Sequence, residues 1–239
     1  MSILFKLRNR KLGFFELLVM GFNLYLKHFR SFFSLVCMIS TFSAIFQFFP
    51  LNIIEFLFNG NYFICYLLFT LFYFFVVEPV STIIFAIFVE SYILGGNPQL
   101  NITIQGILPR IMQLNWLSIT FNTIFMLRLL LIVVPGVIYL VNNIYYYLAF
   151  ILRDQKGEAA FQYSRALVKS NWWEVFFFYV LSGIITFVSN ELMNKIISSI
   201  IINSPISVTI LSSTLTSLVL FGVGISKVLL FLNLEFQKK

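Results

Sequence analysis

Long apolar stretches that carry few charged side chains constrain this chain more than any other feature. The first covers residues 32–49, which contain no charged residue, and five comparable stretches follow. A helix needs about 17 to 25 consecutive apolar residues to cross the hydrocarbon core of a bilayer. The pattern therefore predicts an all-α fold: a polytopic integral membrane bundle of about six transmembrane helices, with residues 1–239 as a single membrane domain.

Loops, turns and helix-breaking residues separate the expected spans. The spans are residues 32–49, 62–77, 114–134, 137–152, 172–188 and 208–232. Proline removes a backbone donor and bends or ends a helix, and glycine freely adopts positive φ. We therefore expect structural breaks at Pro79, which follows Glu78, and at Pro135 with Gly136, where the third and fourth spans would form a tight hairpin.

The composition excludes a water-soluble fold. Hydrophobic residues make up 60% of the chain and charged residues only 10%, whereas about a quarter of the residues in a soluble domain are charged. Basic juxtamembrane residues account for the formal net charge of +7, because such residues are attracted to anionic lipid. Anionic membrane lipids are thus the expected partners, together with a membrane-protein partner and without nucleic acid.

The distribution of lysine and arginine predicts the orientation of the spans. With the amino terminus inside the cell, nearly all of these residues outside the spans are cytoplasmic, and only Lys195 lies in an outer loop. Cytoplasmic loops carry this excess of basic residues in membrane proteins. We therefore expect both termini, and the connecting segments 95–113 and 153–171, to be cytoplasmic.

Two segments have the polar periodicity of amphipathic surface helices. Within residues 1–31, the polar residues Glu16, Asn23, Lys27 and Arg30 recur at spacings of seven, four and three. Within residues 153–171, Glu158, Gln162, Arg165 and Lys169 recur at four, three and four. Each set occupies one side of a helix that can lie in the membrane interface. The candidate contacts with lipid headgroups are Lys27, Arg30, Arg165 and Lys169, while a competing interpretation makes Arg165 a structural latch paired with Glu174 or Glu78.

Polar residues inside the spans are the remaining candidates for function. An ionisable residue within a membrane is costly and is a functional hypothesis by default, which applies to Glu78, Arg128 and Lys227. The alternative is that these three are structural or lie at the interface. Asn142 and Asn143 are expected to form interhelical hydrogen bonds. We find no combination of residues in the sequence that indicates catalysis, and we expect no cofactor, no metal and a surface position for His28.

Residues 133–176 resemble a large family of bacterial six-helix inner-membrane proteins. The stretch VVPGVIYLVNNIYYYLAFILRDQKGEAAFQYSRALVKSNWWEVF has the family's order of apolar run, Pro-Gly, second apolar run, short turn, Ser-Arg pair and aromatic re-entry. The matching positions are Pro135, Gly136, Gly157, Ala159, Ser164, Arg165, Lys169 and Trp173. The family includes the membrane domain fused to bacterial glycerophosphodiester phosphodiesterases and many stand-alone proteins. The resemblance implies a six-helix fold in the bacterial inner membrane and no catalytic residue, because the phosphodiesterase domain is absent from this chain.

Three functions are compatible with these features. The first is a non-enzymatic scaffold or accessory factor that contacts lipids and partner proteins through its amphipathic helices. The second is a transporter or channel-like component, including export of a membrane-active peptide or self-immunity to one, which interrupted helices favour. The third is an intramembrane lipid enzyme, for which the sequence offers neither paired carboxylates nor paired histidines.

Overall fold

The computed structural model describes residues 3–33, 36, 72, 78–96, 98, 103, 105–106, 108–200 and 205–238, and all regular secondary structure among them is helical. The all-α prediction is therefore confirmed. Four stretches in this part of the chain are long and apolar enough to cross a membrane: Ile111–Leu131, Val133–Arg153, Trp172–Ile200 and Leu211–Gln237. The first two expected spans, 32–49 and 62–77, lie almost entirely outside the described residues.

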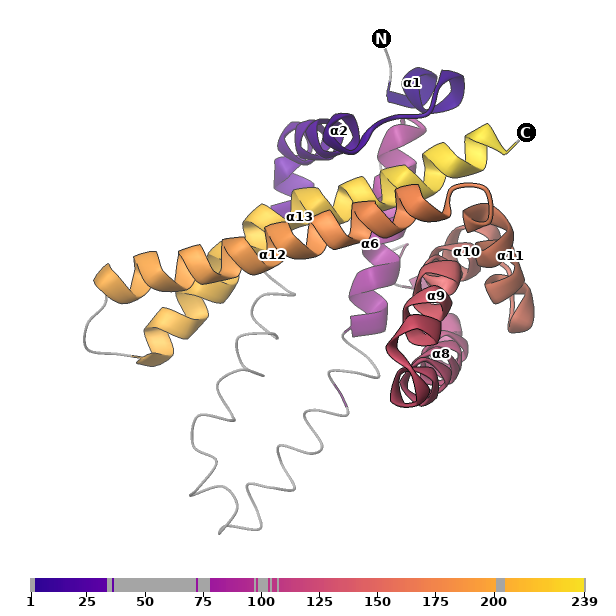
Figure 1. Cartoon of the computed structure of the whole chain (residues 1–239). Coiled ribbons are helices and arrows are strands. Elements are labelled where there is room, and N and C mark those ends of the chain that lie inside the picture. The colour runs from indigo at the N-terminus through magenta and orange to yellow at the C-terminus, as the bar shows by residue number, and fades with distance from the viewer. Residues whose placement is uncertain are drawn as a thin grey trace.

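Two long helices run side by side through the centre of the molecule (Figure 1). They are α12, Trp172–Ile200, and α13, Pro205–Gln237. Proline is well tolerated at the first position of a helix, as in α13. The expected fifth span ended at residue 188, but α12 continues for 29 residues. At a rise of about 1.5 Å per residue it exceeds the thickness of a hydrocarbon core, about 30 Å.

Two short helices near the amino terminus lie against the carboxyl-terminal half of α13 (Figure 1). They are α1, Ile3–Asn9, and α2, Phe14–Lys27. Gly21 of α2 meets Gly222 and Ser226 of α13, and a Cβ added at Gly21 would lie 2.2 Å from the Ser226 Oγ. Close approach of two helix backbones requires small residues at their crossing. Gly21 therefore fixes where α2 crosses α13.

A buried asparagine of α13 holds the turn between α1 and α2. Asn233 is fully buried, and its Oδ1 accepts a hydrogen bond of 3.1 Å from the Leu12 backbone N–H. Its Nδ2 donates to the carbonyl oxygens of Leu7 and Arg10 at 2.8 and 2.9 Å. Buried polar groups are stable only when they are hydrogen-bonded, and Asn233 satisfies three backbone groups of a turn that is far away in the sequence.

The remaining helices surround the other side of α13. They are α6, Glu78–Ile93; η3, Leu108–Arg110; α8, Ile111–Leu131; α9, Val133–Asn143; α10, Tyr146–Arg153; and α11, Glu158–Val168. Large buried side chains of these helices and of α13 form one core, which includes Ile84, Phe88, Leu148, Leu167, Leu229 and Phe231. Between α10 and α11, Asp154 and Gly157 take positive φ values of 52° and 55°, which Asp tolerates and Gly adopts without strain.

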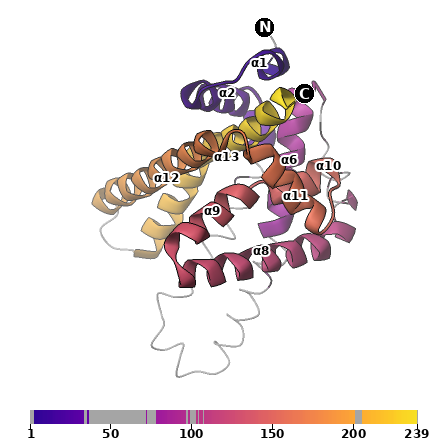
Figure 2. The ribbon, with the colours of Figure 1, turned by 45° about the vertical axis from the view of Figure 1, so that its right-hand side comes forward.

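The chain reverses between α8 and α9 at Ile132, not at Pro135 and Gly136 as the sequence suggested. Ile132 is extended, with φ −157° and ψ 139°, and Figure 2 shows the two helices meeting at this point. Pro135 and Gly136 lie inside the first turn of α9. The first four N–H groups of a helix have no intrahelical acceptor, so proline costs little there. Gly136 allows α9 to pass close to the backbone of α8, because a Cβ added at this position would lie 3.1 Å from the Leu129 Cα.

This correction leads to a prediction for the hairpin between α8 and α9. Pro135→Ala should leave it intact, because the reversal does not depend on proline. Gly136→Ala should destabilise it by about 1 kcal/mol, at the lower end of the cost of overpacking, because the added methyl group meets the α8 backbone. Thermal unfolding of the two purified variants compares them directly. Greater destabilisation by Pro135→Ala than by Gly136→Ala would contradict this account of the turn.

The expected fourth span is also divided. α9 ends at Asn143, a turn follows at Ile144 and Tyr145, and α10 begins at Tyr146. The helix is interrupted because the Tyr145 backbone N–H donates to the Ser164 Oγ of α11 at 3.1 Å, a hydrogen bond that competes with the bonds within the helix. At the other expected break, α6 as described opens with Glu78 and Pro79. The residues before them lie outside the described part, so this interruption stays a prediction.

The segments that the sequence assigns to the cytoplasm gather at one end of the molecule. Lys11 donates to the Asn171 Oδ1, joining the amino-terminal segment to the segment before α12. Arg110 pairs with Asp154 at 3.5 Å, joining segments 95–113 and 153–171. The carboxyl-terminal turns of α13 lie at the same end (Figure 1). A common end is what the predicted topology requires, although the side of the membrane stays a prediction.

Candidate functional site

The helix α2 has three distinct faces. One face is buried against the bundle through Leu17, Met20, Gly21, Leu24 and Tyr25. A second, apolar face consists of Phe15, Val19, Phe22 and Leu26, is half-buried at Phe22 and exposed elsewhere, and is followed by the exposed Phe29 and Phe33 in the helical residues after His28. The third is polar and consists of Glu16, Asn23 and Lys27, all exposed, and is followed after His28 by the exposed Arg30. We call the second face the apolar stripe.

The apolar stripe is the feature of α2 that its packing leaves unexplained. Phe15 is 77% exposed and Leu26 is 65% exposed, although α2 already buries another face against α13. Lys27 is the last residue of α2, and Arg30 follows shortly after the end of this helix. An exposed apolar surface next to cations is the arrangement that a helix needs to lie in the membrane interface. The stripe and its cations therefore form the strongest candidate site in the described residues.

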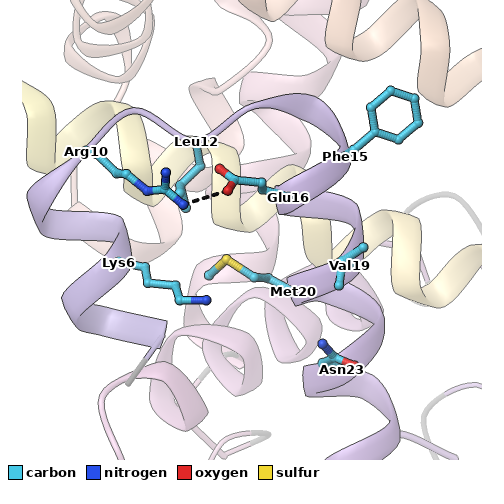
Figure 3. A pocket seen from close by; sticks show the side chains of 8 residues that line it. All are labelled: Lys6, Arg10, Leu12, Phe15, Glu16, Val19, Met20 and Asn23. Carbon is cyan, nitrogen blue, oxygen red and sulfur yellow. Dashed lines mark hydrogen bonds and ion pairs between the residues drawn. The ribbon is translucent and has the colours of Figure 1, made fainter. Parts of the chain in front are cut away.

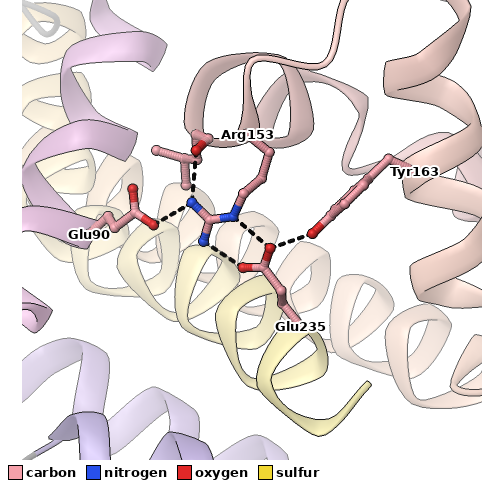
Figure 4. A network of polar contacts seen from close by, with 5 residues as sticks. Glu90, Arg153, Tyr163 and Glu235 are labelled. Carbon is pink, nitrogen blue, oxygen red and sulfur yellow. Dashed lines mark hydrogen bonds and ion pairs between the residues drawn. The ribbon is translucent and has the colours of Figure 1, made fainter. Parts of the chain in front are cut away.

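A polar network joins four helices at the same end of the molecule (Figure 4). Arg153 of α10 binds Glu235 of α13 with two parallel hydrogen bonds, from Nε and Nη2, each of 2.5 Å. Its Nη1 donates to the Glu90 Oε1 of α6 at 2.7 Å. Tyr163 of α11 donates its hydroxyl hydrogen to the Glu235 Oε1. Bidentate arginine–carboxylate pairs are among the strongest polar contacts in proteins, so this network fixes the relative positions of these helices.

Tyr163 remains a hydrogen-bond donor over the whole physiological pH range. Burial and its hydrogen bond to Glu235 raise the pKa of Tyr163 to about 12. The Tyr163 ring also forms a cation–π contact, with the Lys238 Nζ 5.6 Å from the ring centroid. Tyr163 therefore acts in this network as a hydrogen-bond donor to Glu235.

Ser164 and Arg165 of α11 bind the break between α9 and α10. The Ser164 hydroxyl donates to the Asn142 carbonyl oxygen at 2.9 Å while accepting from Tyr145. Arg165 donates from Nε to the Asn143 Oδ1 at 2.9 Å, and Asn143 donates to the Tyr139 carbonyl oxygen of its own helix at 2.8 Å. Backbone groups freed by the break thus find partners on α11, as buried backbone groups must.

Arg165 and Lys169 differ in their surroundings. Arg165 contacts Asn143 and forms an ion pair of 3.2 Å with Glu158, so among the described carboxylates its partner is Glu158 and not Glu174. Lys169 is exposed and has no ion pair in the described part of the chain. The side chain of Glu78 lies outside the described residues. Arg165 is therefore attached to the fold by Asn143 and Glu158 although its side chain is 46% exposed, and Lys169 is exposed without an ion pair among the described residues.

The two described cations of the predicted spans each lie over an aromatic ring. The Arg128 guanidinium, in the last turn of α8, is 4.5 Å from the centroid of the Tyr139 ring on α9. The Lys227 Nζ of α13 is 5.3 Å from the centroid of the Tyr179 ring on α12. Cation–π contacts of this kind partly replace water around a charge. Among the described residues, neither cation forms an ion pair.

His28 stacks on Tyr92 at the end of α2, rather than standing free on the surface. The two ring centroids are 4.0 Å apart with an angle of 22° between the planes. Burial and the neighbouring Lys27 charge lower the pKa of His28 below its usual value of about 6.5. The folded state therefore holds the proton less tightly than the unfolded state, and stability falls as the pH drops through and below 6.5.

We predict that His28→Phe removes this part of the pH dependence while preserving the ring stack. The measurement is the melting temperature of the purified protein at pH 7 and pH 5. All other titrating groups are common to both proteins, so the informative quantity is the difference between their changes in melting temperature. The wild type should lose more. An equal or smaller loss in the wild type would show that His28 does not titrate in this contact.

Three residues that hold the fold at this end were not predicted from the sequence. Glu90, Glu235 and Asn233 were not singled out, because each lies near the end of an apolar helix where a polar residue is ordinary. The sequence did contain one signal for them. A polar residue within a predominantly apolar helix faces the bundle more often than lipid, so all three could have been predicted to face the interior. Their partners could not be inferred, because these lie on other helices.

Comparison with known proteins found no match for this chain among family models, curated proteins or solved structures. The likeness to the six-helix inner-membrane family therefore stays a prediction drawn from residues 133–176.

Proposed function

We propose that this chain is a non-enzymatic, multi-pass protein of a bacterial inner membrane that serves as a scaffold or accessory factor. In this proposal α1 and α2 lie in the cytoplasmic interface and contact anionic lipid. Six spans with both termini inside complete the topology, two of them formed by residues outside the described part. The bundle provides a rigid base, and the interfacial layer provides the contact with lipid and with a partner membrane protein.

The observation that carries the proposal is the combination of faces on α2. Its buried face packs against α13, which fixes the orientation of the helix in the folded protein. Phe15, Val19 and Leu26 of its apolar stripe are exposed, and the exposed Lys27 and Arg30 follow them in the sequence. Each basic residue near an anionic membrane surface contributes about 1 kcal/mol of attraction. The second amphipathic helix, α11, contributes less, because Arg165 is engaged by Asn143 and Glu158.

The test uses a fluorophore placed on the apolar stripe. Leu26→Cys is labelled in a chain whose two natural cysteines are replaced, Cys37→Ser and Cys65→Ser, and the protein is reconstituted in vesicles. Brominated phosphatidylglycerol should quench the label more than brominated phosphatidylcholine does. Lys27→Gln with Arg30→Gln should remove most of this preference, because the two cations next to the label are lost.

The matched control removes two lysines elsewhere at the same end. Lys156→Gln with Lys169→Gln changes the net charge equally but leaves α2 unaltered, so the lipid preference at residue 26 should persist. Loss of the preference in this control would mean that net charge alone attracts the lipid. A label with water-like emission and no quenching by either lipid would show that α2 does not lie in the interface.

A transporter or channel-like role is the second candidate, and one observation favours it. Lys227 lies within the fourth apolar helix, half-buried, and its described contact is the Tyr179 ring. Among the described residues Lys227 pairs with no carboxylate, and an ionisable residue within a membrane-spanning helix is a functional hypothesis by default. Lys227→Met separates the two roles: transport across vesicles would be lost in a transporter, whereas the scaffold should retain its lipid preference and stability.

A further inference from the structure

The two amino-terminal helices line an open cavity of about 340 Å³ (Figure 3). Lys6 of α1 extends across it toward Met20 of α2, and Arg10, from the turn after α1, reaches toward Glu16. Leu12 and Met20 also line the cavity and are almost fully buried. The cavity therefore combines two cations with an apolar lining.

The charges of this cavity do not balance. Arg10 pairs with Glu16 through an Nη2–Oε1 distance of 2.6 Å. Lys6 is half-buried, and it makes no hydrogen bond or ion pair with any residue that the structure describes. The Arg10 and Glu16 side chains are 59% and 46% exposed, so the cavity is open to water and its net positive charge attracts anions. Two cations and one carboxylate give the lining of the cavity an excess of one positive charge, which favours the binding of a single anionic group.

The apolar side of the cavity indicates which kind of anion fits. Phe15 and Val19 line it, and they are also the first two residues of the apolar stripe. A soluble phosphate would use the cations and leave this apolar surface in water. An amphiphile would use both, with its anionic head at Lys6 and Arg10 and its chain along the stripe. The proposed interfacial position of α2 brings phospholipids to this opening.

We propose that the cavity between α1 and α2 binds one molecule of an anionic phospholipid. Its phosphate contacts Lys6 and Arg10, and one acyl chain lies along the apolar stripe from Val19 onward. Glu16 competes with the phosphate for Arg10 and so sets the affinity. The inference rests on the proposed function, because it assigns to the interfacial layer a specific bound lipid in addition to a general attraction.

The experiment counts lipids that stay bound to the intact protein. Protein reconstituted with equal amounts of phosphatidylglycerol and phosphatidylcholine is extracted into mild detergent and analysed by native mass spectrometry. The wild type should retain one phosphatidylglycerol. Lys6→Gln should lower its retention about fivefold, the effect of removing one basic residue near the headgroup. Glu16→Gln should raise retention, because Arg10 is then free to bind the phosphate.

Two further variants separate the site from its surroundings. Lys156→Gln removes an exposed lysine at the same end and should leave retention unchanged. Val19→Trp keeps both cations but fills the space for the chain, so it should lower retention without any change of charge. Glycerol phosphate, which is the headgroup without its chains, should not displace the bound lipid even at millimolar concentration.

Opposite effects of Lys6→Gln and Glu16→Gln, with loss in Val19→Trp, would support the site. Unchanged retention in Lys6→Gln, or lowered retention in Glu16→Gln, would overturn it, and displacement by glycerol phosphate would identify an anion site for soluble phosphates instead. The quenching measurement at residue 26 keeps the two proposals apart. If the preference for phosphatidylglycerol there persists in Lys6→Gln while retention is unaffected, the bound-lipid site is wrong and the interfacial function stands. If the preference for phosphatidylglycerol at residue 26 is absent while one phosphatidylglycerol is still retained, the interfacial function is wrong and the bound-lipid site stands.

Discussion

Replacing Arg153 by methionine should lower the free energy of unfolding by about 3 kcal/mol, the lower end of the cost of removing one partner of a buried ion pair. The side chains of Arg153, Glu90 and Glu235 are 26%, 19% and 17% exposed. Without the guanidinium, two carboxylates would remain close together and largely shielded from water. Denaturant unfolding of the purified protein in mixed micelles measures the difference.

Two comparisons identify the cause of that loss. Arg110→Met breaks an exposed pair with Asp154 and should cost less than about 1 kcal/mol. Combining Arg153→Met with Glu90→Gln and Glu235→Gln should restore much of the stability, because the uncompensated carboxylates are gone. If Arg153→Met unfolds no more readily than Arg110→Met, the network contributes little to the fold.

The second large effect is expected where α2 crosses α13. Gly21→Ala should destabilise the protein by about 1 to 3 kcal/mol, as overpacking of a filled site does. The added Cβ would lie 2.2 Å from the Ser226 Oγ and 2.7 Å from the Gly222 carbonyl oxygen. The second contact is with backbone, so α2 must move away from α13. A cysteine introduced at the buried Leu24 should then become accessible to a water-soluble thiol reagent.

The same substitution elsewhere provides a control of opposite sign. Gly183 lies within α12, and no heavy atom would come within 4 Å of its Cβ. Gly183→Ala should therefore be neutral or stabilise the protein by about 0.5 to 1 kcal/mol, because alanine loses less conformational entropy than glycine in a helix. Equal behaviour of the two variants, with Leu24→Cys still protected, would contradict the close crossing of α2 and α13.

The parts of the fold that depend on local periodicity could be predicted from the sequence. Apolar length alone indicated the regions of α8, α12 and α13, because a membrane span is a property of one continuous stretch. The spacing of polar residues indicated the exposed faces of α2 and α11, and Ala160 and Leu167 of α11 are indeed buried opposite its polar side. The six-span count and the orientation stay predictions.

The parts that depend on distant partners could not be predicted. Arg153 binds residues 63 and 82 positions away, and no local pattern specifies such pairs. The break after Asn143 has the same origin, since Ser164 supplies the competing acceptor from another helix. The position of the reversal at Ile132 was missed for another reason. Proline and glycine usually mark turns, but here they serve the start of a helix and a close backbone contact.

The last two turns of α13 bind segments that are synthesised before α13 itself. Asn233 and Gln237 bind the turn around Leu7 and Arg8, while Glu235 binds Arg153 and Tyr163. A ribosome delivers α1 and α2 long before these residues emerge. Until α13 is complete, α2 lacks both the helix that it crosses and Asn233, which holds the turn before α2. The face of α2 that is buried in the folded protein therefore has no packing partner at that stage. Packing of α2 is therefore expected only after the last turns of α13 have been synthesised, and nascent chains halted before residue 233 should leave Leu24 open to labelling.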